Sequence, residues 1–160
     1  PLHAANAYAA LARGNGVRLS PRLIEGVPRP EPVDLGFDPT GVSMAMRGLE
    51  MAVRERRGTG HHLTIEGRQE PMFNAEGVQV WGKTGTATSS PVRARDPDGE
   101  GAARGEILQE GDHSWFVILV GRDRPRYVIS VVMDFAGSGG KVSGPIANQI
   151  IHALIAEGYL

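Results

Sequence analysis

The sequence contains no cysteine, which excludes disulfide bonds and thiolate metal sites. The lack of cysteine does not identify a cellular compartment, because many exported proteins share it. An excess of one charge is also missing, since 17 Lys and Arg residues stand against 18 Asp and Glu residues. Nucleic acids and anionic membrane surfaces are bound by clustered basic residues, so neither is an expected partner.

Long apolar stretches are absent as well. No run reaches the about 18 residues that a membrane-spanning helix needs, and no charged start followed by an apolar stretch marks a signal peptide. The chain begins at Pro1 without an initiator Met and enters a helical pattern at once, which is typical of a piece of a longer protein. We therefore expect any export signal or membrane anchor to lie outside this chain.

The composition suits one packed core, because 41% of the 160 residues are hydrophobic. Apolar residues at helical spacing, together with capping residues, predict three helices. These run from Ala4 to Ala12, from Asp38 to about Arg56, and from near Ser143 to Gly158.

Three segments have the composition of strands: residues 78–86, 115–120 and 127–133. The short connection between the last two requires an antiparallel hairpin. The proline-rich segment 17–37 is predicted to be an extended connector, with its best candidate for an edge strand at Leu23-Ile24. Residues 58–76 are predicted as loop, and residues 89–112 as a mobile surface loop. The sequence thus predicts an α+β fold, an antiparallel sheet covered by helices.

The stretch GVQVWGKTGT, which begins at Gly77, fits two incompatible motifs. Gly77–Thr84 matches the phosphate-loop pattern G-x-x-x-x-G-K-[ST], and Val131-Val132-Met133-Asp134 resembles the apolar run with an Asp that holds magnesium in nucleotide hydrolases. A phosphate loop needs a strand before it, a flexible turn within it and a helix after it. Here the interior VQVW has strand chemistry and the residues after Thr84 are poor helix formers. A P-loop nucleotide hydrolase is therefore the weaker alternative.

The last four residues of the stretch spell the K-T-G-T of a penicillin-binding active-site strand. Together with LHAANAYAALARGNGVRLSPRLIEG, the helix from Asp38, HSWFVILVGRDRPRYVISVVMDF and GGKVSGPIANQIIHALI, they occur in the order of one family. In these segments the chain resembles the C-terminal part of the transpeptidase domain of a class B penicillin-binding protein, a serine D,D-transpeptidase that cross-links peptidoglycan. The resemblance implies a partial penicillin-binding/β-lactamase-like fold, with residues 1–160 forming the C-terminal portion of one domain.

The residues of K-T-G-T suit the binding of a carboxylate. Lys83 supplies a cation and the hydroxyls of Thr84 and Thr86 supply donors, provided that their side chains face one groove. Gly85 lets a substrate backbone approach and pair along the strand edge. By resemblance, the N–H of Thr86 forms half of the oxyanion hole. The substrate would be a peptidoglycan stem peptide or a β-lactam, and no cofactor or metal is required.

Several other residues attract attention but receive no site role. His61 and His62 are adjacent, and neighbours on a loop rarely bind one metal ion together, so we expect two solvated loop residues. Trp81 and Trp115 are expected in the core or in a groove wall.

The chemistry of the family also requires a nucleophilic serine in Ser-x-x-Lys and a Ser-x-Asn loop. Ser-x-Asn does not occur, and the one Ser-x-x-Lys, Ser138-Gly139-Gly140-Lys141, lies in a glycine-rich turn before the last helix. The nucleophile is therefore absent, and we predict that this chain is inactive alone and that penicillin leaves its mass unchanged.

The resemblance implies a parent protein anchored in the bacterial inner membrane with this domain on the extracytoplasmic side. Other cell-wall synthesis proteins are possible partners, and a catalytically silent module of the same fold is a further alternative. Apolar surface that faces missing helices would be exposed, so we expect self-association.

Overall fold

The computed structural model describes residues 1–95 and 105–160. Its centre is a three-stranded antiparallel sheet with the strand order β5-β8-β9. The strands span β5 (Gln79–Thr88), β8 (Asp112–Gly121) and β9 (Tyr127–Met133). The helices are α1 (Leu2–Arg13), α2 (Pro39–Arg54) and α3 (Ser143–Ala156). The predicted α+β arrangement is confirmed, and the second helix ends two residues before the predicted Arg56.

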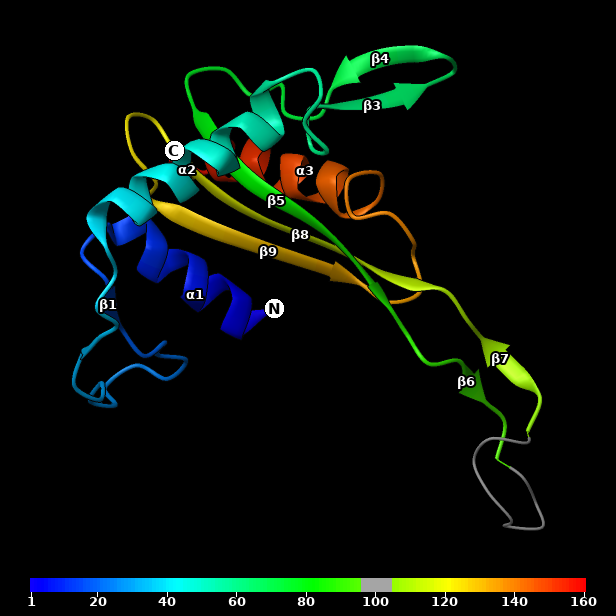
Figure 1. Cartoon of the computed structure of the whole chain (residues 1–160), viewed down its shortest axis with the longest axis horizontal. Coiled ribbons are helices and arrows are strands. Elements are labelled where there is room, and N and C mark those ends of the chain that lie inside the picture. The colour runs from blue at the N-terminus through cyan, green and yellow to red at the C-terminus, as the bar shows by residue number, and fades with distance from the viewer. Residues whose placement is uncertain (96–104) are drawn as a thin grey trace.

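The two faces of the sheet pack against different helices (Figure 1). On β8, Phe116, Ile118 and Val120 belong to a core cluster with Ala147 and Ile151 of α3. The intervening Leu119 packs on the other face with Trp81, Tyr8 and Leu11, the last two from α1. The strand period of two thus distributes the apolar run of β8 between both faces.

Helix α2 packs against the first half of β5, beside Trp81 and Gly82. Asp38 caps its N-terminus by accepting a hydrogen bond from the N–H of Gly41 at 2.7 Å, as its position before Pro39 predicts. Leu49 packs into the cluster of the α1 face, and Val53 packs into the cluster of the α3 face. The helix therefore bridges both layers at this edge.

The hairpin that joins β8 to β9 is confirmed. Its last pair is Val120 with Tyr127, and the N–H of Arg126 donates to the carbonyl of Val120 at 2.9 Å. A side chain on Gly121 would place its Cβ 1.9 Å from the carbonyl oxygen of Arg124. The turn therefore requires glycine at this position.

The proline-rich connector pairs at its ends rather than at Leu23-Ile24. β1 (Val17–Arg18) pairs with β2 (Val33–Asp34), while Leu23 and Ile24 are 81% and 69% exposed. The predicted edge strand is wrong. Prolines between the two ends lack N–H donors, so the middle of the connector offers few ladder bonds.

The predicted loop at residues 58–76 contains a hairpin of β3 (His62–Ile65) and β4 (Arg68–Pro71). Its turn is Glu66-Gly67, and both residues have positive φ, 50° and 80°. This is the backbone of a two-residue hairpin turn whose twist matches the strands. The sequence prediction failed because every residue of β4 is exposed, so burial imposes no alternation.

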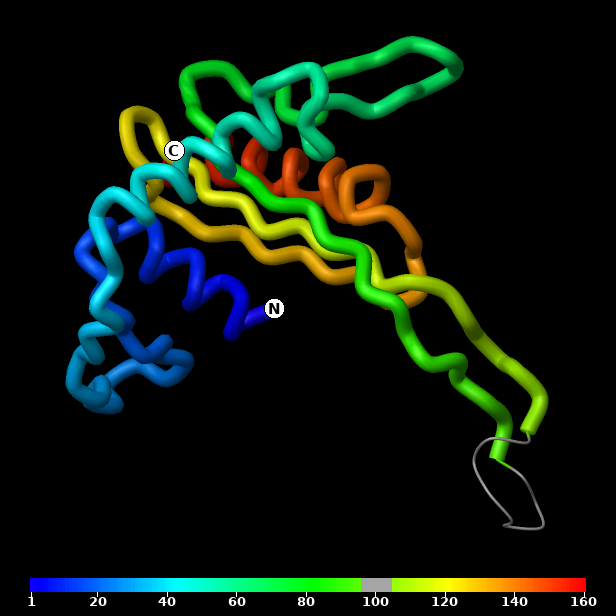
Figure 2. The backbone as a smooth tube through the Cα atoms, viewed as in Figure 1, coloured from blue at the N-terminus to red at the C-terminus, as the bar shows by residue number. Residues whose placement is uncertain are grey.

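The predicted loop at residues 89–112 is also partly wrong. β6 (Val92–Arg93) pairs with β7 (Ile107–Gln109), and in Figure 2 they continue β5 and β8 as an arm that leaves the sheet. Residues 96–104 of this predicted mobile loop lie outside the described residues.

Candidate active-site strand

The K-T-G-T segment lies within β5, an edge strand of the central sheet. Lys83, Thr84, Gly85 and Thr86 stand opposite Val117, Phe116, Trp115 and Ser114 of β8. Within residues 1–95 and 105–160, no strand pairs with the outer side of β5. An edge of this kind offers backbone donors and acceptors to an added peptide strand.

Adjacent side chains of the motif lie on opposite faces. Lys83 lines a hollow beside Leu49 and Ala52 of α2, and a Cβ on Gly85 would meet the Cβ of Trp115 at 3.2 Å. Thr84 and Thr86 stand opposite Phe116 and Ser114, whose side chains lie on the α3 face, so they share that face. The requirement that Lys83, Thr84 and Thr86 share one groove is therefore not met on either face of the strand. A ligand that touches all three must lie along its outer edge.

The Lys83 ammonium is exposed and donates a hydrogen bond to the carbonyl of Thr84 at 2.6 Å. In the part of the chain that the structure describes, no carboxylate lies within 4.0 Å of this ammonium. Its charge is thus uncompensated. An exposed, unpaired ammonium beside an open strand edge is suited to an anionic group.

The hydroxyl of Thr84 forms a hydrogen bond with the hydroxyl of Thr59 at 2.7 Å. Thr59 lies in the turn after α2. A Cβ on Gly140 would lie 2.7 Å from the carbonyl oxygen of Thr59, so the two backbones are in close contact. The sequence predicts only a loop at residues 58–76 and gives no indication of this contact. A pair separated by 25 residues leaves no local sequence signal.

The segment Ser138-Gly139-Gly140-Lys141 forms a turn, as predicted. The N–H groups of Lys141 and Val142 both donate to the carbonyl of Ser138 at 3.1 Å, and α3 begins only at Ser143. Gly139 lies against both strands, since its Cβ would come within 2.2 Å of the Trp115 carbonyl oxygen and 2.3 Å of that of Gly85. Its N–H donates to the Thr86 hydroxyl at 3.4 Å.

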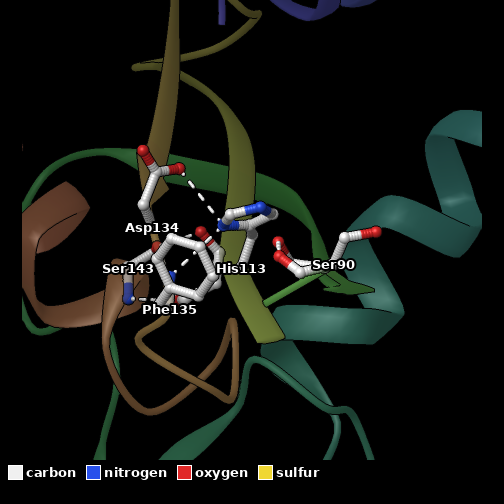
Figure 3. A network of polar contacts seen from close by, with 7 residues as sticks. Ser90, His113, Asp134, Phe135 and Ser143 are labelled. Carbon is white, nitrogen blue, oxygen red and sulfur yellow. Dashed lines mark hydrogen bonds and ion pairs between the residues drawn. The ribbon is translucent and has the colours of Figure 1, made fainter. Parts of the chain in front are cut away.

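Two buried serines, one of which is labelled Ser143 in Figure 3, attach this turn and α3 to β8. Ser114 and Ser143 are both 0% exposed, and their hydroxyl oxygens lie 2.7 Å apart. The Ser114 hydroxyl also donates to the carbonyl of Ser138, while the Ser143 hydroxyl donates to the carbonyl of Ser114. Beside them, Nδ1 of His113 accepts from the N–H of Phe135 and lies 3.2 Å from a carboxylate oxygen of Asp134. The network fixes the turn that contacts Thr86.

The two adjacent histidines are not solvated loop residues as predicted. His61 and His62 are partly buried, their Nδ1 atoms lie 3.2 Å apart, and His62 begins β3. In residues 1–95 and 105–160, no group of three or more His, Cys, Asp or Glu residues could hold a metal ion. Trp81 is 8% exposed and belongs to the core, as predicted.

The phosphate-loop alternative does not fit this geometry. The chain enters β5 at Gln79, two residues after Gly77, and remains extended through Lys83 and Thr84. Asp134 follows β9, which is antiparallel to its neighbour rather than reached through a crossover. In the part of the chain that the structure describes, no backbone loop surrounds Lys83, so phosphate groups have no cradle there.

A sequence model described as the penicillin binding protein transpeptidase domain matches residues 1–152. The chain belongs to this family. Among curated proteins, peptidoglycan D,D-transpeptidase MrdA of Haemophilus influenzae is 26% identical over 107 residues, which cover 67% of this chain and 15% of MrdA. The match therefore spans less than a sixth of that relative's length.

Solved structures show the same fold. The transpeptidase domain of penicillin-binding protein 3 from Burkholderia pseudomallei has a TM-score of 0.58 and 25% identity, over 96% of this chain and 41% of that one. A complex of PBP2 with MreC from Helicobacter pylori has a TM-score of 0.64 and 17% identity, over 97% of this chain and 24% of that one. The predicted fold, part of a penicillin-binding transpeptidase domain, is confirmed. Among the described helices of this chain, none is long and apolar enough to cross a membrane.

Proposed function

We propose that this chain is the substrate-binding part of a D,D-transpeptidase that cross-links peptidoglycan stem peptides by serine acyl transfer. The observation that carries the proposal is the position of Lys83–Thr86 on an open edge strand, with an uncompensated ammonium and two hydroxyls. Family membership supports the reaction class.

The edge of β5 binds substrate in two ways in this proposal. An extended stem peptide, or the ring of a β-lactam that imitates it, lies antiparallel or parallel to the strand and shares its backbone hydrogen bonds. Its terminal carboxylate receives the charge of Lys83 and the hydroxyl hydrogen bonds of Thr84 and Thr86. Because these side chains come from both faces, the carboxylate lies at the edge between them.

Catalysis requires more than binding. When a serine attacks the acyl carbonyl, the carbonyl oxygen of the substrate becomes negative. The N–H of Thr86 stabilises this negative oxygen as half of the oxyanion hole. Removing one such donor typically costs about 3 kcal/mol of barrier stabilisation. The serine itself belongs to a Ser-x-x-Lys motif that we place outside this chain, because Ser138 lies in a turn with no helical Lys beside it. The chain alone is therefore inactive.

The parent protein, in this proposal, is anchored in the bacterial inner membrane with this domain on the extracytoplasmic side, where peptidoglycan is built. Its partners are stem peptides and other cell-wall synthesis proteins. The Helicobacter pylori complex of PBP2 with MreC shows one such assembly for a relative.

The first test is incubation of the chain with fluorescent penicillin, followed by intact-mass measurement. We expect an unchanged mass, and a stable adduct on Ser138 would overturn the proposal that the nucleophile lies elsewhere. The second test is an NMR titration of the ¹⁵N-labelled chain with an acyl-D-Ala-D-Ala peptide. Shifts should centre on residues 83–86.

A pair of matched variants locates the binding. Thr86→Val should weaken peptide binding, because it removes the hydroxyl and keeps the backbone N–H. Thr88→Val is the control, since Thr88 lies on the same strand and face and is exposed. Equal affinity of the two variants would show that the Thr86 hydroxyl does not bind the carboxylate.

A catalytically silent module is the second candidate, favoured by the absence of Ser-x-Asn from the 160 residues. Sequencing the reading frame upstream of Pro1 separates the two. Finding Ser-x-x-Lys followed by Ser-x-Asn would support the transpeptidase. Finding neither motif would support the catalytically silent module.

A further inference from the structure

A basic cleft lies where β8 turns into β9, away from the K-T-G-T segment. It has a volume of about 480 Å³ and is bounded by the C-terminal end of α1 and by residues 124–128. Three arginines line it, Arg13, Arg124 and Arg126, together with Asn15 and Tyr127. Ala9 and Ala12 of α1 also line it.

The three arginines are exposed, and the one side-chain hydrogen bond that the described residues show for them runs from the Arg13 guanidinium to the carbonyl of Val17 at 3.5 Å. In the described parts of the chain, no carboxylate lies within 4.0 Å of any of them. The nearby acidic residue of the turn, Asp123, is exposed and does not line the cleft. Because the chain as a whole has a net charge of −1, this cluster is a local concentration of positive charge.

The arginines are held on a rigid support. Arg124 and Arg126 flank Pro125 in the turn that requires Gly121 and that the Arg126 N–H closes onto Val120. The Arg126 guanidinium lies 5.8 Å from the centre of the Tyr127 ring, which orients it by a cation–π contact. A preorganised guanidinium loses less conformational entropy when it binds.

The residues around the cleft are those of a protein interface rather than those of a typical phosphate site. Phosphate sites typically use helix N-termini and clustered backbone N–H groups, whereas the helix end at this cleft is the C-terminus of α1, which carries partial negative charge. Planar guanidinium groups pair with carboxylates through two parallel hydrogen bonds. Arg and Tyr, which line this cleft, are also residues enriched at the centres of protein interfaces.

We propose that this cleft binds an acidic segment of a protein partner, whose carboxylate side chains pair with Arg13, Arg124 and Arg126. The site lies outside the active-site strand, and the proposal does not rest on the transpeptidase function. A partner bound here would leave the edge of β5 free for substrate.

The test is a fluorescence-anisotropy titration of the full chain with a fluorescein-labelled peptide of alternating Glu and Gly. Arg124→Glu and Arg126→Glu should each weaken binding roughly fivefold or more, and added salt should weaken binding to the unchanged chain. Arg68→Glu is the matched control, because Arg68 is exposed on β4 and makes the same change of charge. Arg124→Gln provides a neutral variant, and far-UV circular dichroism checks that each variant is folded.

If Arg68→Glu weakens peptide binding as much as the cleft variants do, the peptide is attracted by the overall charge of the chain rather than by a site. This result would overturn the proposal. Stronger binding of inorganic phosphate or of a single-stranded oligonucleotide, lost in the same variants, would overturn the choice of a carboxylate ligand. NMR shifts of the labelled chain with the Glu-Gly peptide should fall on residues 13–15 and 124–128. Shifts confined to residues 83–86 would show that the peptide binds at the substrate strand, and would refute binding in the cleft.

Discussion

Gly139→Ala tests the contact between the 138–141 turn and the active-site strand. The added methyl carbon would come within 2.2 Å of the Trp115 carbonyl oxygen and 2.3 Å of the Gly85 carbonyl oxygen. Both are backbone atoms of paired strands, so the turn must move away by about 1 Å to reach ordinary contact distance. Overpacking of this kind costs about 1–3 kcal/mol.

Displacement of the turn adds a second cost. The hydrogen bond from the Gly139 N–H to the Thr86 hydroxyl is lost, and the bond from the Ser114 hydroxyl to Ser138 is strained. Each bond contributes about 1 kcal/mol. We expect the variant to lose about 2–4 kcal/mol of unfolding free energy, a large part of the about 5–15 kcal/mol of a typical domain.

The assay is urea unfolding followed by tryptophan fluorescence and by far-UV circular dichroism. Gly48→Ala is the control, because nothing lies within 4 Å of a Cβ at this position in α2. It should stabilise the chain by about 0.5–1 kcal/mol through its helix propensity. A loss below about 0.5 kcal/mol in Gly139→Ala would refute the close approach of turn and strand.

Three further predictions follow from buried or exposed groups. Ser114→Ala and Ser143→Ala should each lower the unfolding free energy by about 1–3 kcal/mol, and in a double-mutant cycle the losses should not add, because the two hydroxyls share one network. Burial raises the pKa of Tyr8, so the folded state favours the neutral phenol. The contribution of Tyr8 to the unfolding free energy should therefore be complete below about pH 10 and decline as the pH rises further. Urea unfolding across this range should show this decline in the wild type and not in Tyr8→Phe. Exposed apolar residues such as Leu23 and Ile24 should promote self-association. Light scattering that reports a monomer at all concentrations would contradict the last expectation.

The sequence predicted the elements that burial and chain length constrain. The hairpin of β8 and β9 was predictable because two apolar runs with a short connection allow only one pairing. The hairpin of β3 and β4 was not, because its exposed strands need no apolar alternation. K-T-G-T was recognisable as a contiguous motif.

Contacts between distant segments left no such signal. Thr59 reaches Thr84 only once α2 lies along β5, and Ser114 meets Ser143 only when α3 folds back on the sheet. The basic cleft was hidden for another reason. Net charge sums over all residues, whereas Arg13 and Arg126 come together only through the contact of α1 with the start of β9.

Because the hydroxyl of Thr84 is held by that of Thr59, which follows α2, ligand binding at Thr84 depends on the position of α2. A helix shift of an ångström would stretch the 2.7 Å contact beyond hydrogen-bond range and free the Thr84 hydroxyl to rotate. Carboxylate affinity would then change while Lys-Thr-Gly-Thr stayed intact. In the proposed transpeptidase, altered β-lactam susceptibility could therefore arise from substitutions along α2, and inspection of the motif alone would overlook them.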